Sequence, residues 1–297
     1  MHDPELPPTE LTNPRSARLD AQTPAEIAEL LLAEEARSVR AIGACAAAIA
    51  DVAGWVAQSL REGGRLAYVG AGTSGRLGIL DAVECVPTFR TDPRDVFGVI
   101  AGGERAITRA VEGAEDDEED GRAQMRAHAV GARDTVVGIA ACGKTPFVHG
   151  ALAEAKSLGA RTALVTSGAP GPRAYIDALI VLPTGPEVLA GSTRLKAGTA
   201  TKIVLNAIST TAMVLLGKVY RNLMVDLRPT NSKLRARATR LVADLARVDA
   251  ERAREALAAT GWQVKVAVVA LRRGVTAHEA ARLLAAQGGM LGKALGE

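Results

Sequence analysis

The chain has 297 residues, of which 48% are hydrophobic and 23% are charged, and its formal net charge at pH 7 is +3. This length is enough for one large α/β domain with a smaller appendage, and the composition is ordinary for a globular protein. So small a net charge, combined with an aromatic content of 3%, argues against a nucleic-acid partner.

The location of the protein is predicted from several weak signals. We expect no membrane-spanning helix, because no uninterrupted apolar run approaches the ~18 residues that cross a bilayer. The first residues, MHDPELPPTELTNPRS, lack the basic and apolar regions of a signal peptide. The three cysteines (Cys45, Cys85 and Cys142) are odd in number and scattered, which argues against disulfides. The four histidines show no metal-ligand spacing, so we predict a cytoplasmic protein without a metal.

The N-terminal part is predicted to be an arm followed by two helices. Residues 1 to about 22 are rich in proline and aperiodic. Thr23 can cap a helix whose first residue is Pro24. A second helical pattern covers about 42–60, and Gly63-Gly64 ends it.

Five short apolar segments then follow, and helical stretches separate most of them. Continuous rather than alternating apolar residues indicate strands that are buried on both faces, as in a parallel sheet. The predicted fold is therefore α/β, a parallel sheet sandwiched by helices. The predicted strands are RLAYVG (65–70), DVFGVIAG (95–102), DTVVGIAAC (134–142), RTALVTSG (161–168) and ALIVLPTG (178–185).

The last third of the chain is predicted to be helical. Residues 195–220 read as a long buried helix, and beyond residue 231 the composition shifts to Ala, Arg and Leu with helical spacing. Glycines at 261 and 274 separate short helices around 249–259, 262–272 and 276–285. We predict three parts: an N-terminal arm with helices (1–55), a central domain (56–220) and a helical C-terminal subdomain (221–297).

Three predicted strands lead into loops of small and hydroxylated residues that open helices. Backbone N–H groups at a helix N-terminus bind anions, and Ser and Thr hydroxyls add donors that suit a phosphate monoester. One such loop is equally well explained as an ordinary helix cap, but three of them favour a phosphate site. The loops are GAGTSG (70–75), ACGKTP (141–146) and GPEVLAGSTRLKAGT (185–199).

Two nucleotide-binding motifs match only formally. The G-x-G-x-x-G pattern of the first loop lacks an acidic residue at the end of the second strand, which would hold a ribose. The G-x-x-x-x-G-K-[ST] pattern at 138–145 begins inside a predicted strand, and no later strand ends in an obvious magnesium-binding Asp. We therefore disfavour both dinucleotide binding and ATP hydrolysis.

Carboxylates that could carry chemistry lie in two places. Glu84 falls at the end of the helix that GTSG opens, with Asp81 three residues earlier on nearly the same face. Glu115 belongs to the acidic run 112–120, most of which is expected to be a solvated helix start. Spacing alone does not single out Glu115.

Long segments of the chain resemble the N-acetylmuramic acid 6-phosphate etherase family. They are GAGTSGRLGILDAVECVPTF, IAGGERAITRAVEGAEDDEEDG, VVGIAACGKTPFV, GSTRLKAGTATKIVLN and NLMVDLRPTN. The resemblance implies a sugar isomerase (SIS) domain of flavodoxin-like architecture at 56–220. It also implies a cytoplasmic homodimeric lyase that uses no cofactor and acts on an amino-sugar phosphate.

The resemblance also assigns roles to residues. It implies that Glu84 and Glu115 are catalytic, with Glu84 protonating the departing lactyl oxygen and Glu115 handling the C2 proton of the sugar. Cys142 replaces the usual Ser of the family, and Thr193 and Leu195 replace Ser and Met. The residues expected to bind substrate and its phosphate are Gly72, Thr73, Ser74, Gly75, Cys142, Gly143, Lys144, Thr145, Ser192, Thr193 and Lys196.

Two alternative functions stay open on the sequence. One is a regulator that senses a sugar phosphate without turnover, like the glucokinase regulatory protein. That type is expected to be much longer, with two such domains in tandem. The other is an aldose–ketose isomerase, which would also use a carboxylate base.

Overall fold

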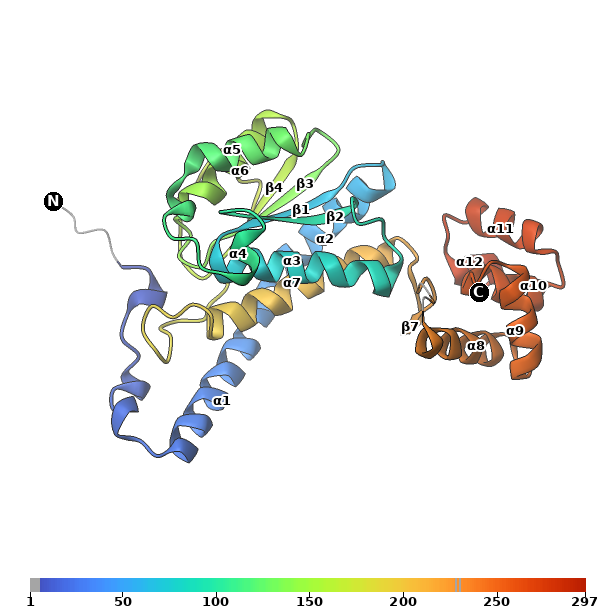
Figure 1. Cartoon of the computed structure of the whole chain (residues 1–297), viewed down its shortest axis with the longest axis horizontal. Coiled ribbons are helices and arrows are strands. Elements are labelled where there is room, and N and C mark those ends of the chain that lie inside the picture. Colours follow the sequence, from blue (N-terminus) through green and yellow to red (C-terminus); the bar gives the residue numbers. More distant parts are fainter. Residues whose placement is uncertain (1–5, 228, 230) are drawn as a thin grey trace. The chain divides into compact units, whose positions relative to one another are not determined.

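The computed structural model describes residues 6–227, 229 and 231–297 (Figure 1). By internal contacts the chain divides into two compact units, one formed by Met1–Ala82 and Arg94–Ser209 and the other by Val83–Pro93 and Thr210–Glu297. Helices α3 (Gly72–Phe89) and α7 (Lys196–Leu215) contribute residues to both units. The division expected from the sequence, at residues 55 and 220, stays a prediction.

A five-stranded parallel sheet forms the centre of the first unit. The strand order is β2-β1-β3-β4-β5, which is the flavodoxin-like order, and each neighbouring pair is parallel. All five predicted strands are present, and the predicted fold class is confirmed. The strands are β1 (Leu66–Gly70), β2 (Val96–Ile100), β3 (Thr135–Ile139), β4 (Arg161–Thr166) and β5 (Ala178–Val181).

The register of the strands places the loops after β1, β2 and β3 at one edge of the sheet. Gly70, the last residue of β1, pairs with Ile100 at the end of β2 and with Ile139 at the end of β3. The chain crosses from β1 to β2 on one side and continues from β3 to β5 on the other. Such a switch point, at the carboxyl ends of the strands, is where open α/β sheets bind their ligands.

Helices cover both faces of this sheet. Helices α5 (Glu118–Ala127) and α6 (Pro146–Ser157) lie on one side, and α3 and α7 lie on the other (Figure 1). On β1 the alternate residues Ala67 and Val69 belong to the core cluster that includes Phe147 of α6.

Tyr68 of β1 faces the opposite side and ties α3 and α7 to the sheet. Its hydroxyl donates to Asp81 Oδ2 (2.8 Å), while Asp81 Oδ1 accepts from Asn206 Nδ2 (2.6 Å) and the Ser209 hydroxyl (3.1 Å). Asp81 is buried and its hydrogen bonds are satisfied. It therefore fixes α3 in place rather than serving as a reactive group.

The N-terminal helices contain a stretch of high average hydropathy. Short 3-10 helices at Pro8–Glu10, Pro14–Ser16 and Leu19–Ala21 precede α1 (Pro24–Ala41), the 3-10 turn η4 (Ile42–Cys45) and α2 (Ala46–Arg61). A capping box between Thr23 and Glu26 starts α1 as predicted.

The helical stretch Pro24–Arg61 is long and apolar enough to cross a membrane, with a mean hydropathy of 1.5 over 18 residues, of which 28% are buried. The stretch meets this criterion by its average hydropathy, since the charged Asp51 still interrupts it and no unbroken apolar run approaches 18 residues. In the fold, Ile49, Val52 and Val56 of α2 are buried core residues. Packing of these residues in the core accounts for part of the apolar character of α2.

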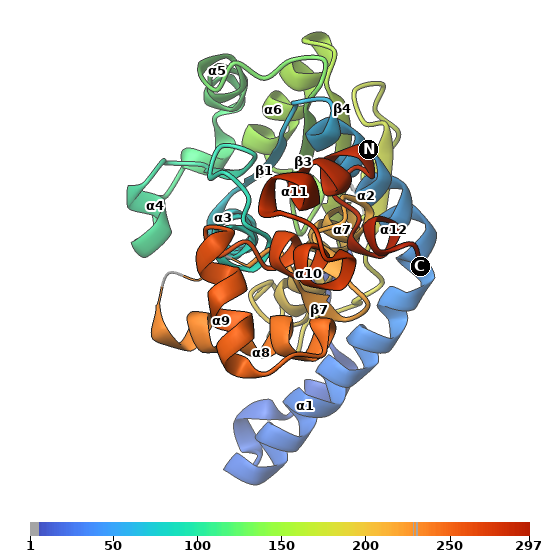
Figure 2. The same ribbon diagram turned by 90° about the vertical axis from the view of Figure 1, so that its right-hand side faces the viewer.

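The second unit is helical, as predicted (Figure 2). A short hairpin of β6 (Val219–Tyr220) and β7 (Leu223–Met224) leads into its helices. Its core includes Leu241, Val268 and Leu284. The helices are α8 (Ser232–Ala246), α9 (Ala250–Ala259), α10 (Val264–Arg273), α11 (Ala277–Ala286) and α12 (Leu291–Leu295).

Candidate active site

The start of α3 offers backbone donors that the protein itself does not use. Helix α3 begins at Gly72, directly after β1, and its first backbone bond runs from Gly75 N–H to Ala71 O (3.2 Å). Within the described residues, no acceptor is present for the N–H groups of Gly72, Thr73 and Ser74 or for the two hydroxyls. The first N–H groups of any helix lack intrahelical partners and favour an anion.

Gly75 allows this helix start to lie close to the sheet. A Cβ at residue 75 would lie 2.6 Å from Ile100 Cγ1 and 2.7 Å from Gly70 O. Both distances are shorter than a carbon side chain tolerates, so only glycine lets the first turn of α3 approach β1 and β2 this closely.

A cavity of about 270 Å³ opens beside the start of α3, on its β2 side. Glu115 lies on the single 3-10 turn η5 (Ala114–Asp116), which follows Gly113 in the left-handed region (φ 75°). The carboxyl of Glu115 therefore shares a cavity with the unpaired end of a helix. The lining residues are Ala71, Gly72, Arg76, Ala101, Ala106, Ala110, Val111, Glu112, Gly113 and Glu115.

Larger hollows of about 460 to 530 Å³ lie among the C-terminal helices α8 to α11. None of the site residues predicted from the sequence lines them. We therefore place the candidate site at the smaller cavity, where a carboxylate and a helix N-terminus meet.

The loop after β3 lies next to the start of α3, because β1 and β3 are neighbours in the sheet. Gly143 has φ 75°, and a Cβ there would lie 2.9 Å from Thr166 Oγ1, so the turn requires glycine. Thr145 precedes α6 without capping it through its side chain, and Lys144 is exposed. Cys142 is a partly exposed free thiol. The Gly143 N–H group donates to Ala140 O (2.9 Å), so it is not available to a ligand. The side chains of Cys142, Lys144 and Thr145 remain open to one.

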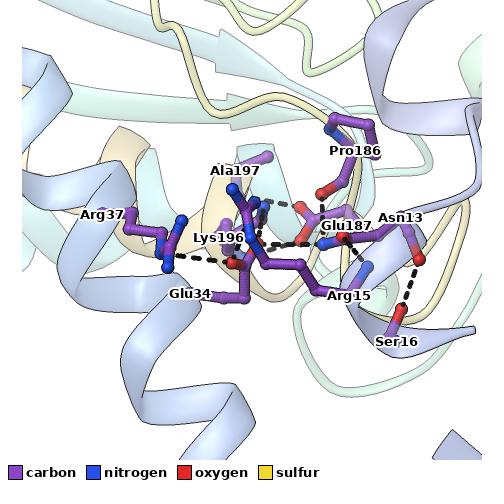
Figure 3. Close-up of polar contacts among 9 residues, drawn as sticks. All are labelled: Asn13, Arg15, Ser16, Glu34, Arg37, Pro186, Glu187, Lys196 and Ala197. Carbon is purple, nitrogen blue, oxygen red and sulfur yellow. Dashed lines mark hydrogen bonds and ion pairs between the residues drawn. The ribbon is translucent and has the colours of Figure 1, made fainter.

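The start of α7 is occupied by a carboxyl group of the protein (Figure 3). Glu187 Oε2 accepts from Lys196 N–H (3.1 Å) and Glu187 Oε1 accepts from Ala197 N–H (2.9 Å). Glu187 is fully buried, and this burial raises its pKa although the two N–H groups favour its ionised form. The helix end that the sequence suggested as a third phosphate site thus binds Glu187.

The ammonium of Lys196 is ion-paired in the interior. Its Nζ lies 2.9 Å from Glu34 Oε2, and the two side chains are 5% and 2% exposed. Asn13 Nδ2 also donates to Glu34 Oε2 (2.9 Å), and Arg15 lies 3.3 Å from Glu34 Oε1 (Figure 3). Burial would raise the pKa of Glu34, but the hydrogen bonds from Lys196 and Asn13 and the nearby positive charges lower it below its ordinary value. Lys196 thus joins α7 to α1 and the N-terminal arm.

The first turn of α7 nevertheless lies against the start of α3. A Cβ placed on Gly198 would be 3.7 Å from Thr73 Cγ2. Ser192 and Thr193, in the loop before α7, are partly exposed, and no hydrogen bond of their hydroxyls occurs among the described residues. The structure therefore brings the three predicted loops together at one edge of the sheet.

Glu84 lies away from this edge along its own helix. It is 12 residues beyond Gly72 on α3, which corresponds to about 18 Å along the helix axis at 1.5 Å per residue. Glu84 is exposed and does not line the cavity that Glu115 lines. Of the two predicted catalytic residues, Glu115 lines this cavity, whereas Glu84 belongs to the other compact unit.

Sequence reasoning missed Glu34, Glu187 and Arg76. Glu187 lies nine residues before Lys196 and is not the N-cap residue, so local capping patterns do not single it out. Nothing local points to Glu34, which is 162 residues from Lys196. Within the described residues, no group of three or more His, Cys, Asp or Glu side chains could hold a metal ion.

Comparison with known proteins identifies the family. Residues 48–156 match the glucokinase regulatory protein N-terminal SIS domain, and residues 221–278 match the C-terminal lid domain of glucokinase regulatory protein. An N-acetylmuramic acid 6-phosphate etherase of Gloeobacter violaceus is 53% identical over 97% of this chain and 94% of its own length. The chain belongs to the N-acetylmuramic acid 6-phosphate etherase family.

Further etherases are similar over nearly the whole chain. The etherase of an Exiguobacterium species is 48% identical over 97% of this chain and 98% of its own length. That of Deinococcus radiodurans is 46% identical over 100% of this chain and 97% of its own length. These relatives confirm the family predicted from the sequence, and the SIS match confirms the predicted domain type.

Proposed function

We propose that this protein is an N-acetylmuramic acid 6-phosphate etherase, a carbon–oxygen lyase. It cleaves the D-lactyl ether of its substrate and yields N-acetylglucosamine 6-phosphate and D-lactate. The observation that carries the proposal is the 53% identity over nearly the full length of both chains. The position of Glu115 beside the open start of α3 supports it.

The substrate phosphate binds at the β1 and β3 loops in this proposal. Thr73, Ser74 and Thr145 supply hydroxyls, and the N–H groups at the start of α3 supply backbone donors. Cys142 replaces a hydroxyl by a weaker thiol donor, so Lys144 contributes through its backbone N–H group. The Gly143 N–H group, which the sequence also suggested, already donates to Ala140 O (2.9 Å). The hydroxyls of Ser192 and Thr193 complete this set from the loop before α7, while Lys196 holds that loop in place through Glu34.

Glu115 is the base of the proposed reaction. In the open-chain sugar, the C1 aldehyde acidifies the hydrogen on C2, and the Glu115 carboxylate removes it as a proton. The C2 electron pair then forms a double bond to C3 as the C3–O bond breaks. Glu84 donates a proton to the departing lactyl oxygen, which leaves as D-lactate. Positioned acids and bases of this kind each contribute about 10²- to 10⁴-fold to a rate.

Water completes the reaction. Its oxygen adds to C3 of the unsaturated aldehyde while Glu84 takes up the proton that the water loses. C2 regains the proton held by Glu115, which gives N-acetylglucosamine 6-phosphate and returns both glutamates to their starting states. Every step consists of proton transfer and C–O bond breaking or making, so the proposal includes no metal or redox cofactor. Because a phosphorylated sugar does not cross a membrane unaided, we propose that the enzyme acts in the cytoplasm.

In this proposal, the two glutamates act on adjacent atoms and come from two copies of the chain. The proton on C2 and the oxygen on C3 lie within a few ångströms, and each catalytic group must come within hydrogen-bond reach of its atom. Gly72 and Glu84 are about 18 Å apart along α3 by the helical rise. We propose a homodimer with a two-fold axis, in which Glu84 of one protomer reaches the Glu115 cavity of its partner.

Release of D-lactate tests the proposed function. The purified protein is incubated with N-acetylmuramic acid 6-phosphate, and D-lactate is measured with a D-lactate dehydrogenase. Turnover supports the etherase. Binding of a hexose phosphate without any lactate would support the regulator instead, to which the two domain matches also point. Conversion of an aldose phosphate to a ketose phosphate without lactate would support the isomerase.

A further inference from the structure

Two backbone carbonyl groups hold the Arg76 side chain at the edge of the Glu115 cavity. It lies on α3, directly after Gly75. Its Nε donates to Ile107 O (3.0 Å) and its Nη2 donates to Arg109 O (3.1 Å). Both carbonyls belong to the segment around the short helix α4 (Arg105–Thr108). Two backbone acceptors thus fix one edge of the guanidinium.

The other edge of the guanidinium is unused. A guanidinium has five N–H groups in a planar fork. Arg76 donates two of them to these carbonyls. Within the described residues, its Nη1 has no acceptor and Arg76 forms no ion pair, although it lines the cavity with Glu112 and Glu115. A guanidinium whose orientation is already fixed loses little entropy when its free edge binds a carboxylate in a bidentate manner.

An anionic ligand in this cavity needs a positively charged side chain beside it. Of the ten lining residues, Glu112 and Glu115 are acidic and Arg76 is basic. A carboxylate brought near Glu112 and Glu115 is repelled by both unless a positive charge lies beside it. Arg76 supplies that charge.

We propose that Arg76 binds the carboxylate of the lactyl group and so distinguishes the substrate from the sugar product. This inference rests on the proposed function. The substrate carries two anionic groups, the phosphate on C6 and the carboxylate of the lactyl ether on C3. Glu115 acts at C2, so its cavity must also hold C3 and the ether. The phosphate occupies the start of α3 and the β3 loop in this proposal, so the anionic group left for Arg76 is the lactyl carboxylate.

Variants of Arg76 test this assignment with two ligands. Turnover of N-acetylmuramic acid 6-phosphate is compared with two properties of N-acetylglucosamine 6-phosphate, which lacks the carboxylate: its Kd, and the rate at which its C2 hydrogen exchanges in D₂O. In R76M, kcat/KM for the substrate should fall about 10- to 100-fold, the range expected for loss of a hydrogen-bonded charge partner. The Kd and the exchange rate should stay within about twofold, because neither involves the carboxylate.

Two further variants complete the experiment. R105M removes the same charge from an exposed position on α4 that does not line the cavity, and it should leave all three quantities unchanged. R76K keeps the charge but not the planar fork, so it should lose less than R76M. It also keeps the test decisive if R76M does not fold.

Three outcomes are informative. Loss confined to the lactyl substrate supports the proposal. An equal loss of product binding and exchange, or no loss at all, would overturn it, because Arg76 would then only support α4 or be dispensable. Absence of D-lactate from the wild-type protein would instead reject the proposed function, and this result is distinguishable because it involves no variant.

Discussion

The starts of α3 and α7 look alike in sequence, but the protein satisfies the backbone N–H groups of only one of them. Both follow loops of Gly, Ser and Thr. At α3, the N–H groups of Gly72, Thr73 and Ser74 have no acceptor among the described residues. At α7, the N–H groups of Lys196 and Ala197 bind the buried carboxyl of Glu187. One helix start is therefore left for a ligand, and the other is closed by the protein.

This difference shows that a helix start becomes a binding site only when the chain does not satisfy it. The dipole and N–H groups of any helix favour an anion. A carboxyl group nearby in the fold takes that place at α7, and the ion pair between Lys196 and Glu34 anchors the helix further. A loop pattern alone does not report which of the two situations applies.

The largest expected effect concerns catalysis at the open helix start. In E115Q, kcat for release of D-lactate should fall about 10²- to 10⁴-fold, because the amide cannot accept the C2 proton. The free energy of unfolding should change by less than about 0.5 kcal/mol, since Glu115 is exposed. D116N is a matched control, an exposed neighbour on η5 that does not line the cavity. Equal losses of kcat in both variants would remove Glu115 from its catalytic role.

The next effect concerns stability at the closed helix start. K196M leaves Glu34 buried without its ammonium partner, which should cost about 3–5 kcal/mol in the free energy of unfolding. K202M, an exposed lysine on the same helix, should cost less than about 0.5 kcal/mol. Urea titrations of the three proteins measure both values. If K196M kept full stability but raised KM strongly, Lys196 would be a phosphate ligand, as the sequence suggested.

The smallest effect is the pH dependence that Glu187 confers on stability. Its pKa in the folded protein is raised above the ordinary 4.5 by burial. The folded state therefore binds the proton more tightly, so this contribution to stability is full below pH 4.5 and is lost as the pH rises through the folded pKa. E187Q lacks this titration. Wild-type stability relative to E187Q should therefore fall with rising pH, by about 1.4 kcal/mol per unit of pKa shift.

Unfolding curves of both proteins at several pH values check this behaviour. A stability difference between wild type and E187Q that does not vary with pH would mean that burial does not perturb the carboxyl group. The start of α7 would then resemble an exposed cap rather than a closed one.

The parts of the fold that sequence predicted best are those that local patterns determine. The five strands are continuous runs of Val, Ile and Leu, and α9, α10 and α11 are bounded by Asp249, Gly274 and Thr276. The stretch at α1 and α2 is apolar by its average hydropathy and not as an unbroken run, so a search for unbroken runs does not find it.

The candidate site was predictable in composition but not in arrangement. The loops that contain Thr73 and Thr145 follow neighbouring strands, so their proximity follows from the fold. The partner of Lys196 was not predictable, because Glu34 is 162 residues away and only tertiary packing brings them together. The separation of Glu84 from the start of α3 could have been predicted from helix length alone.

The central claim is that each active site combines Glu115 of one protomer with Glu84 of its partner, and mixing two inactive variants tests it most directly. E84A and E115A proteins are each assayed for D-lactate release, then unfolded and refolded together. In a mixed dimer, one site contains both variant positions and the other contains both wild-type glutamates. Random pairing should therefore restore about a quarter of wild-type activity. If the mixture stayed as inactive as its components, both glutamates would act within one chain and the account would be wrong.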